Sequence, residues 1–471
     1  MTKNVLLVDF GSTYTKAIAL NMDDEMILGR SQSATTIETD IMIGLNRAML
    51  DLEKQCGISP KSYSERYASS SAAGGLKMAA IGLVPSLTLE AACRACLGAG
   101  AKVVCSYGYE IDEDIIRDIE RNKCDIIMLA GGTDGGNKTV ILHNAKMLAG
   151  SSIGCPIIVC GNKSVQKEVR RILEDAGKCV YTTNNVLPSL NIVDVEPAQQ
   201  YIRDIFIDHI VKAKGLSGAQ AYIGKSIIPT PMASLSAAAL LADGTESNPG
   251  IGSLLVVEIG GATTNVHSVS DNEPVNQQAI IRGLPESYIK RTVEGDLGIR
   301  WNSHTLFEMA GQERLMSNLR EIKRVCPAEV DFSEYTNFLF ANVGHTPVTE
   351  LEYDLDITLA YTSAGIAVER HAGKLHTEPS IMGDISVQYG KNLLNVKNVI
   401  GTGGIFRYGK ASQRILKAAM YSSDTPESLR PINPEGWLDN EYILYGIGLI
   451  SKDYPDKAIR IAKKYLTPVE I

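Results

Sequence analysis

The sequence has no excess of positive charge: 46 lysines and arginines stand against 54 aspartates and glutamates, for a formal net charge of −8. It therefore lacks the basic field that attracts nucleic acids or anionic membranes, and neither is expected as a partner. No window holds about 18 apolar residues without charges, so no membrane-spanning helix is expected. Small molecules and other proteins are the expected partners.

Cysteine patterns typical of disulfide-bonded or metal-binding proteins are also missing. The nine cysteines are scattered, and the first residues, MTKNVLLVDF, lead into an apolar strand rather than a signal peptide. We expect a cytoplasmic, reduced protein. Cys93 and Cys96 form one CxxC pair in a helical stretch. Because no second pair or nearby histidine completes a ligand set, structural thiols are favoured over a metal or redox site.

Glycine is frequent and clustered: 42 of the 471 residues, about 9%, are glycine, whereas roughly 7% is typical. An apolar strand that ends at Asp9 is followed by Gly11, Ser12 and Thr13 and then by a second strand, which predicts a hairpin. The same pattern recurs 249 residues downstream of Asp9, with Glu258 in its place. The second turn comprises Gly260, Gly261, Ala262, Thr263 and Thr264. This duplication predicts two similar lobes that face each other.

Each predicted hairpin carries groups that bind phosphate. Turn glycines allow close approach of the backbone, and the N–H groups and hydroxyls of residues such as Ser12 and Thr13 can surround an anion. Lys16 either adds a charge or points to solvent. Asp9 and Glu258 are candidate ligands for Mg²⁺, which prefers oxygen donors. One such hairpin alone is as readily an ordinary turn, but two copies predict a clamp around a phosphate chain.

A third glycine cluster follows the second hairpin. Residues Asn398–Gly409 read NVIGTGGIFRYG, a strand that ends in Gly401, Gly403 and Gly404 before a helix. Bare backbone of this kind lets a nucleoside lie flat against the chain. The three clusters together predict a nucleotide site.

Strand and helix signals alternate between the two hairpins. Short apolar strands are predicted at Lys102–Ser106, Asp125–Ala130, Pro156–Cys160 and Cys179–Thr182. This alternation predicts parallel βαβ units. The expected fold is therefore α/β, with a first lobe at residues 1–245 that contains an additional α/β segment at about 98–190, and a second lobe at residues 246–471.

The triple pattern resembles the phosphate 1, phosphate 2 and adenosine motifs of the superfamily of sugar kinases, Hsp70 chaperones and actin. The resemblance covers residues 1 to about 30 and 225 to 450. It implies two duplicated actin-like, or ribonuclease H-like, ATPase lobes with ATP and Mg²⁺ as cofactors. It also implies that the second lobe carries the adenosine-binding element.

Longer motifs resemble one branch of that superfamily, the MutL/GlmL family, which is unrelated to the mismatch-repair protein of the same name. They are DFGSTYTK at Asp9–Lys16, SSSAAGGLKMAAIGL at Ser69–Leu83, LAGGTDGGNKT at Leu129–Thr139, VEIGGATTNVHSV at Val257–Val269 and ERHAGKLH at Glu369–His376. The family accompanies adenosylcobalamin-dependent glutamate mutase and related aminomutases. The resemblance implies an ATP-driven accessory or reactivating chaperone for the mutase subunits and leaves a homodimer open.

The chain departs from the superfamily pattern in two places. The connecting helix predicted at Pro229–Ala242 has no Asp, Glu, Asn or Gln, whereas hydrolysing relatives place a water-orienting acid or amide there. Glu258 and Asn265 stand where aspartates are usual. We therefore expect at most slow ATP hydrolysis, unless another carboxylate such as Asp134 reaches the cleft. The alternatives are a small-molecule kinase of the same fold and an electron-transfer activator that uses the CxxC pair.

Three other features allow both a functional and a structural interpretation. Residues Leu129–Asn137, with the glycine cluster Gly131–Gly136, form either an anion-binding loop or a tight turn capped by Asn137. His371 and His376 are five residues apart, which does not fit one helical face, so structural roles are favoured over metal binding. The acidic run Glu350–Asp356 is expected on the protein surface.

Overall fold

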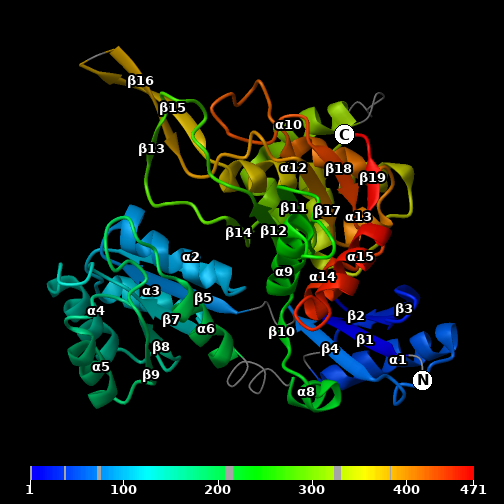
Figure 1. Ribbon diagram of the computed structural model, residues 1–471, viewed down its shortest axis with the longest axis horizontal. Coiled ribbons are helices and arrows are strands. Elements are labelled where there is room, and N and C mark those ends of the chain that lie inside the picture. Colours follow the sequence, from blue (N-terminus) through cyan, green and yellow to red (C-terminus); the bar gives the residue numbers. More distant parts are fainter. Residues whose placement is uncertain (1–2, 37–38, 72–75, 207–215, 323–329, 382) are drawn as a thin grey trace.

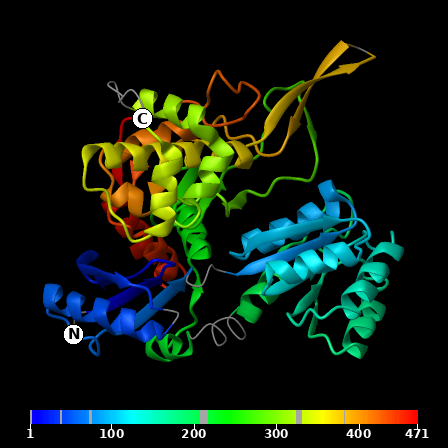
Figure 2. The ribbon, with the colours of Figure 1, turned by 180° about the vertical axis from the view of Figure 1, so that it is seen from behind.

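The computed structural model describes residues 3–36, 39–71, 76–206, 216–322, 330–381 and 383–471. Figure 1 shows three parts: a first lobe in blue, a second lobe from green to red, and an inserted segment in cyan beside them. The same three parts are visible from behind in Figure 2. Among the described residues, no helix combines the length and apolar character that a bilayer crossing requires.

The first lobe is built on a five-stranded sheet in the order β10-β4-β1-β2-β3. Its strands are β1 (Asn4–Phe10), β2 (Tyr14–Asn21), β3 (Met26–Ala34), β4 (Glu65–Ser70) and β10 (Ile228–Pro229). The pairs β1–β2 and β2–β3 are antiparallel, whereas the pairs β1–β4 and β4–β10 are parallel. Helix α1 (Ile41–Cys56) packs on this sheet, with Leu45, Ala48 and Leu52 in the apolar core.

The second lobe repeats this strand order. Its sheet, β14-β12-β11-β17-β18-β19, comprises β11 (Leu254–Ile259), β12 (Thr264–Val269), β14 (Ile289–Glu294), β17 (Asn398–Thr402), β18 (Glu435–Leu438) and the additional β19 (Thr467–Val469). Numbered along each lobe, both sheets run 3-2-1-4-5. The helical elements are α10 (Ser303–Ile322), α11 (Phe332–Ala341), α12 (Glu350–His371), α13 (Gly404–Tyr408) and the 3₁₀ helix η4 (Ser412–Ala419). The predicted α/β class and the two duplicated lobes are confirmed.

The inserted segment lies between β4 and β10 of the first lobe and has its own parallel sheet, β6-β5-β7-β8-β9. The strands are β5 (Lys77–Gly82), β6 (Lys102–Gly108), β7 (Ile126–Leu129), β8 (Ile157–Val159) and β9 (Val180–Thr182). Its helical elements are η2 (Pro85–Leu89), a single π turn, and α2 (Glu90–Gly98), α3 (Glu113–Asn122), α4 (Thr139–Ala149), α5 (Gln166–Asp175) and α6 (Glu196–Ile205). Alternate residues of β5 are buried on opposite faces of the sheet. Met78 and Ala80 pack with the core that includes α2 and α6, whereas Ala79 and Ile81 pack with α3, α4 and α5.

The inserted sheet begins at Lys77, earlier than the expected start at about residue 98. Its first strand in sequence is β5, which lies second in the spatial order of the sheet. The order 2-1-3-4-5 is that of a doubly wound fold, in which the first strand lies inside the sheet. The four strands predicted between residues 102 and 182 are all present, each shifted by a few residues at most.

Two helices connect the lobes at their centre. Helix α8 (Ser217–Ile223) leads into β10, after which α9 (Thr230–Asp243) crosses into the second lobe, and α14 (Leu444–Ile450) packs against α9. Their backbones approach closely at Gly448, where an added Cβ would lie 1.8 Å from the carbonyl oxygen of Ala233. The terminal helix α15 (Pro455–Tyr465) joins the same apolar core.

A small sheet extends from the second lobe as an arm (Figures 1 and 2). It consists of β13 (Ile280–Arg282), β16 (Gly383–Tyr389) and β15 (Lys374–Ser380), in that order. The arm lies away from the connecting helices, and none of the described residues of its strands lines the cavity described below.

Candidate functional site

A cavity of about 510 Å³ lies where the two lobes and the inserted segment meet. Its wall includes the first hairpin, the second hairpin, the turn after β17 and the first residues of α9. The predicted residues that line it are Asp9, Gly11, Ser12, Thr13, Lys16, Glu258, Gly260, Gly261, Ala262, Thr263, Gly403 and Gly404. The duplicated strand order therefore brings the three glycine clusters into one cleft.

The first hairpin turn presents hydrogen-bond donors to this cavity. The N–H of Gly11 donates to the carbonyl of Tyr14 at 3.1 Å, which closes the turn. Thr35 binds the carbonyls of Gly11 and Thr13 from the other side. Among the described residues, the N–H groups of Ser12 and Thr13 have no partner, so they are available to a bound anion.

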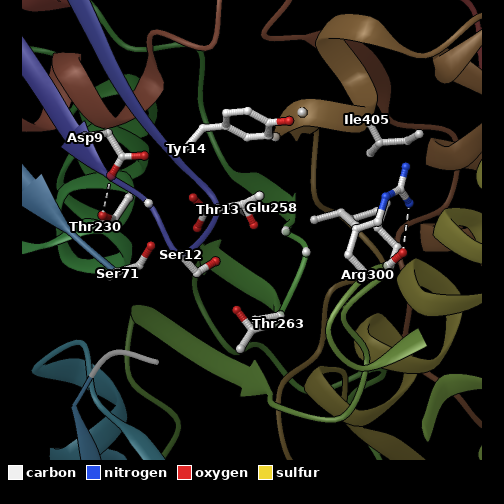
Figure 3. A pocket seen from close by; sticks show the side chains of 18 of the residues that line it. Asp9, Ser12, Thr13, Tyr14, Ser71, Thr230, Glu258, Thr263, Arg300 and Ile405 are labelled. Atoms are coloured by element: carbon white, nitrogen blue, oxygen red, sulfur yellow. Dashed lines mark hydrogen bonds between the residues drawn. The ribbon is translucent and has the colours of Figure 1, made fainter. Parts of the chain in front are cut away.

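The second turn has the same geometry. The N–H of Gly260 donates to the carbonyl of Thr263 at 2.9 Å, and the carbonyl of Gly261 accepts from Arg300 at 2.9 Å. The N–H groups of Gly261 and Ala262 have no partner in the described part of the chain. An added Cβ on Gly261 would lie 3.5 Å from Oγ1 of Thr13, so the turns nearly touch. In Figure 3 the hydroxyls of Ser12, Thr13 and Thr263 point into the space between them.

The fifth residue of the second turn does not belong to the cleft. Thr264 is fully buried and donates its hydroxyl to the carbonyl of Leu297 at 2.9 Å. Its prediction as a phosphate ligand is wrong, because successive side chains of a strand point to opposite faces. Asn265, the next residue, is the one that faces Glu258.

Asp9 lies at the base of the cleft and is 1% exposed. Its Oδ1 accepts hydrogen bonds from Thr230 at 2.7 Å and Ser69 at 3.1 Å, and its Oδ2 lies 3.4 Å from Nζ of Lys16. The ammonium of Lys16 also lies over the ring of Tyr442, 3.7 Å from the centroid. Lys16 thus pairs with the carboxylate instead of pointing to solvent.

Glu258 occupies the matching position in the second lobe and anchors a buried polar network. Its carboxylate accepts from Ser234 and Asn265 at 3.2 Å and lies 3.4 Å from Nε2 of His267. Burial raises the pKa of Glu258, but the His267 contact and the charge of Arg291 outweigh it, so the pKa lies below its usual value. Burial lowers the pKa of His267, and its Nδ1 has no partner among the described residues.

One helix supplies a hydroxyl to each carboxylate. Thr230, the first residue of α9, binds Asp9, and Ser234, one turn later, binds Glu258. Residues four apart share a face of a helix, so both hydroxyls point toward the cleft. Neither hydroxyl was predicted as a site residue, although the TPMAS sequence shows their spacing.

The third cluster forms an open surface after β17. Gly403 has a φ of 117°, and an added Cβ would lie 2.2 Å from the carbonyl of Ile259, so only glycine fits. No atom lies within 4 Å of a Cβ built on Gly404, which leaves backbone open to a flat ligand. Gly401 does not line the cavity but packs under the ring of Phe406, so its prediction as a contact residue is wrong.

An ion pair beside the second hairpin was not predicted. Arg300 donates to both oxygens of Asp356, at 2.5 and 3.3 Å, and both residues line the cavity (Figure 3). Asp356 is 1% exposed, so the expectation that the acidic run Glu350–Asp356 lies on the surface is wrong for its last residue. The two partners are 56 positions apart, and no local pattern links them.

These donors fit a nucleotide with a phosphate chain. N–H groups and hydroxyls that have no partner among the residues described face each other from the two turns, and open backbone lies at Gly404. The described residues contain no group of three or more His, Cys, Asp or Glu that could hold a metal. A Mg²⁺ ion would therefore depend on phosphate oxygens and water, with Asp9 and Glu258 as the nearby carboxylates.

The glycine loop of the inserted segment lies outside the cleft. Asp134 accepts from Asn185 and from the backbone of Lys163, both at 2.9 Å, and does not line the cavity. Asn137 accepts from the N–H of Val140 at the start of α4. The loop is thus a tight strand-to-helix turn, and Asp134 does not supply the missing acid.

The cysteine and histidine candidates have structural surroundings. Cys96 is fully buried on α2, with its sulfur 3.9 Å from that of Met128, and burial raises the pKa of Cys93 to about 12. His371 is buried between Thr292 and Ser268, at 2.9 and 2.8 Å, whereas His376 contacts the ring of Tyr389. None of these residues lines the cavity.

Known proteins match this chain along most of its length. The family model for MutL protein matches residues 5–466. Protein MutL of Clostridium tetanomorphum is 47% identical over 464 residues, which are 98% of this chain and 99% of that protein.

Solved structures match only weakly. The activator of 2-hydroxyisocaproyl-CoA dehydratase from Clostridium difficile, with bound ADPNP, shares 10% identity, with 99% of this chain and 100% of that chain covered and a TM-score of 0.33. Gluconate kinase from Lactobacillus acidophilus shares 9% identity, with 100% and 93% covered and a TM-score of 0.37. These scores are too low to carry an argument about this chain. The family match and the 47% identity show that the chain belongs to the MutL protein family.

Proposed function

We propose that the protein binds ATP with Mg²⁺ in the cleft between its lobes and uses the nucleotide to switch between conformations. The observation that carries the proposal is the pair of hairpin turns, which have the same closing hydrogen bond. From opposite sides they offer N–H groups that no other described residue binds. A phosphate chain between them would bind both lobes at once. Its adenosine would lie over the open backbone at Gly404.

The chemistry of the cleft favours binding over fast turnover. Asp9 and Glu258 are each fixed by a hydroxyl of α9. The acid of that helix is its last residue, Asp243, which accepts from Tyr288 and does not line the cavity, so α9 presents no acid or amide to orient an attacking water. Asp356 also lies in the wall of the cleft, but Arg300 occupies both of its carboxylate oxygens. We therefore expect slow ATP hydrolysis by the chain alone. A small-molecule kinase would need a free carboxylate directed at a substrate hydroxyl, so this alternative is disfavoured.

The proposed partner is an adenosylcobalamin-dependent glutamate mutase or a related aminomutase. Support comes from membership of the MutL protein family together with the motif resemblance described above. In this role the protein would be a cytoplasmic accessory factor that acts on the mutase subunits, and closure of the cleft would change the surface offered to them. Differential affinity of nucleotide and partner for the two conformations would couple binding to release.

The proposal is tested by titrating the purified protein with ATP in the presence and absence of Mg²⁺, and by measuring hydrolysis alone and with an inactivated aminomutase plus free adenosylcobalamin. We expect Mg²⁺-dependent ATP binding and hydrolysis that rises when the mutase is added, together with recovered mutase activity. Phosphorylation of a sugar or acid without any partner would contradict the accessory role.

A variant of Asp9 tests the position of the site. Asp9→Ala should abolish Mg·ATP binding while the far-ultraviolet circular dichroism spectrum stays unchanged, and Asp9→Asn should weaken it with less effect on neighbouring hydroxyls. A matched control is Asp134→Asn, since Asp134 is held in a turn outside the cleft. Unchanged affinity in Asp9→Ala would show that the nucleotide lies elsewhere.

A further inference from the structure

The inserted segment contributes to the cleft through Leu76, Phe206 and the region between α2 and β6, residues 97–102, which is called the α2–β6 turn below. Gly100 and Lys102 of this turn line the same cavity as the two hairpins. The turn therefore forms a third wall of the cleft, in addition to the walls formed by the lobes. Nothing in the duplicated hairpin pattern requires such a wall.

Close backbone packing fixes the turn against α9. Gly100 has a φ of 92°, and an added Cβ would lie 2.8 Å from the Cβ of Pro229 and 3.4 Å from that of Met232. These two residues flank Thr230, whose hydroxyl binds Asp9. A displacement of the turn would thus act directly on the start of the helix that holds both carboxylates.

Two cations fix the turn to the second lobe. Arg291 of β14 donates to the carbonyl of Leu97 at 2.7 Å and to that of Ala101 at 3.4 Å. Its other terminal nitrogen donates to Asn265 at 3.1 Å, beside Glu258. In the opposite direction, Nζ of Lys102 donates to the carbonyl of Gly295 at 3.1 Å. These contacts are polar, as is the pair formed nearby by Arg94 of α2 and Glu286, whose N and O atoms lie 2.6 Å apart. Polar interfaces between parts of one chain commonly permit relative motion.

These cations have no carboxylate within ion-pair distance among the described residues, although both line the cavity. Arg291 is 5% exposed, and its Nε has no partner in the described part of the chain. Burial lowers the pKa of Lys102, with a smaller contribution from the charge of Lys77. Burial also lowers the pKa of Arg291, and the charge of Glu258 offsets only part of this effect. A buried cation that lacks a close counter-charge is unfavourable, and an anion in the cavity would compensate for it.

We infer that Lys102 contacts the terminal phosphate of a bound nucleoside triphosphate and that the α2–β6 turn thereby senses whether this phosphate is present. The inference rests on the proposed function, since it concerns the same nucleotide site. The primary amine of Lys102 would exchange the carbonyl of Gly295 for a phosphate oxygen, while Arg291 holds the turn in place. Loss of the terminal phosphate would return the amine to the uncharged carbonyl of Gly295, a weaker acceptor, and so loosen the α2–β6 turn.

Nucleotide affinities test this role. Wild-type protein and Lys102→Met are titrated with the β,γ-imido analogue of ATP and with ADP, both with Mg²⁺. Because the lost hydrogen bond joins charged groups, we expect Lys102→Met to lower the affinity for the analogue by roughly tenfold or more. The affinity for ADP should change by less than about twofold. Lys102→Arg should retain most of the analogue affinity. Lys146→Met is the matched control, since Lys146 is an exposed lysine on α4 of the same segment.

The outcomes separate this inference from the proposed function. Unchanged analogue affinity in Lys102→Met, or an equal loss for analogue and ADP, would overturn the inference and leave nucleotide binding intact. Absence of binding in the wild type would overturn both.

Hydrogen exchange on the wild type provides a test that needs no variant. The amides of residues 97–102 should exchange more slowly with the analogue than with ADP, whereas those of α4 should not differ. Equal protection of the turn by the two nucleotides would refute the sensor role.

Discussion

The close contact between the two connecting helices yields a prediction whose sign depends on a single distance. Alanine is normally favoured over glycine inside a helix by about 1 kcal/mol. In Gly448→Ala, however, the new Cβ would lie 1.8 Å from the carbonyl oxygen of Ala233 and 2.5 Å from its carbon. These are backbone atoms, so no side-chain rotation relieves the clash, and the helices must separate by roughly 1.5 Å to restore ordinary contact. Overpacking of this kind typically costs about 1–3 kcal/mol, which outweighs the helix propensity.

A matched glycine provides the control. Gly365 lies in the middle of α12, also buried, and its added Cβ would lie 3.6 Å from that of Ala418, an ordinary contact. Gly365→Ala should therefore be neutral or stabilising by up to about 1 kcal/mol. The stability of Gly446→Ala should lie between those of the other two variants. Its new Cβ would lie 2.7 Å from the side chain of Leu7, which can move more easily than backbone.

The assay is urea unfolding, compared by midpoint and slope, followed by ATP titration of each variant. Gly448→Ala should also weaken ATP binding, because Ala233 adjoins Ser234, and displaced α9 would misplace the hydroxyl that binds Glu258. If Gly448→Ala were as stable as the wild type and bound ATP equally well, the packing of α9 on α14 would not position the site. Equal destabilisation by Gly365→Ala would show that the distance to Ala233 is not the cause.

The remaining predictions concern hydroxyls, protons and thiols. Ser234→Ala removes a hydrogen bond to a buried carboxylate, so Mg·ATP affinity should fall by roughly tenfold or more in a binding titration. Ser236→Ala should leave that affinity unchanged, because the Ser236 hydroxyl donates to the carbonyl of Met232 within α9. Burial raises the pKa of Glu65, but hydrogen bonds from two lysines outweigh it and hold that pKa well below its usual range. The resulting stability is therefore present above the ordinary pKa of about 4.3 and lost as pH falls, so denaturation midpoints should drop more in the wild type than in Glu65→Gln between about pH 5 and 3. Replacing Cys93 and Cys96 by alanine should leave ATP affinity unchanged, and iron in the purified wild type would contradict their structural role.

Local patterns sufficed for the parts of the fold that repeat. Both hairpins follow from apolar strands interrupted by a glycine turn, and the repeat at half the chain length predicts two lobes in contact. The two errors at the site, Thr264 and Gly401, have one origin. Each residue belongs to the correct motif, but the face of the sheet to which it points depends on the pairing with neighbouring strands. That pairing places Asn265, not Thr264, opposite Glu258, and Gly401 lies under the ring of Phe406.

Long-range contacts account for what the sequence did not show. The strand β5 was missed because its small alanine-rich sequence carries little strand signal, and it becomes part of the inserted sheet only by pairing with β6 and β7. The pair of Arg300 and Asp356, and the contacts of Arg291 with the inserted segment, join residues from distant elements. Such partners depend on the packed arrangement of three sheets, and no spacing along the chain encodes them.

The position of α9 indicates how the cleft can act as a switch. Thr230 and Ser234 lie one turn apart on a rigid helix, so their separation is fixed, whereas Asp9 and Glu258 belong to different lobes. Both hydrogen bonds can therefore form at only a narrow range of angles between the lobes, and opening must break at least one of them. Each bond to a buried carboxylate contributes about 1.5–3 kcal/mol. A metal-bound nucleotide that competes for either carboxylate would change the energy of closure by a similar amount, which is sufficient to shift a two-state equilibrium by one to two orders of magnitude.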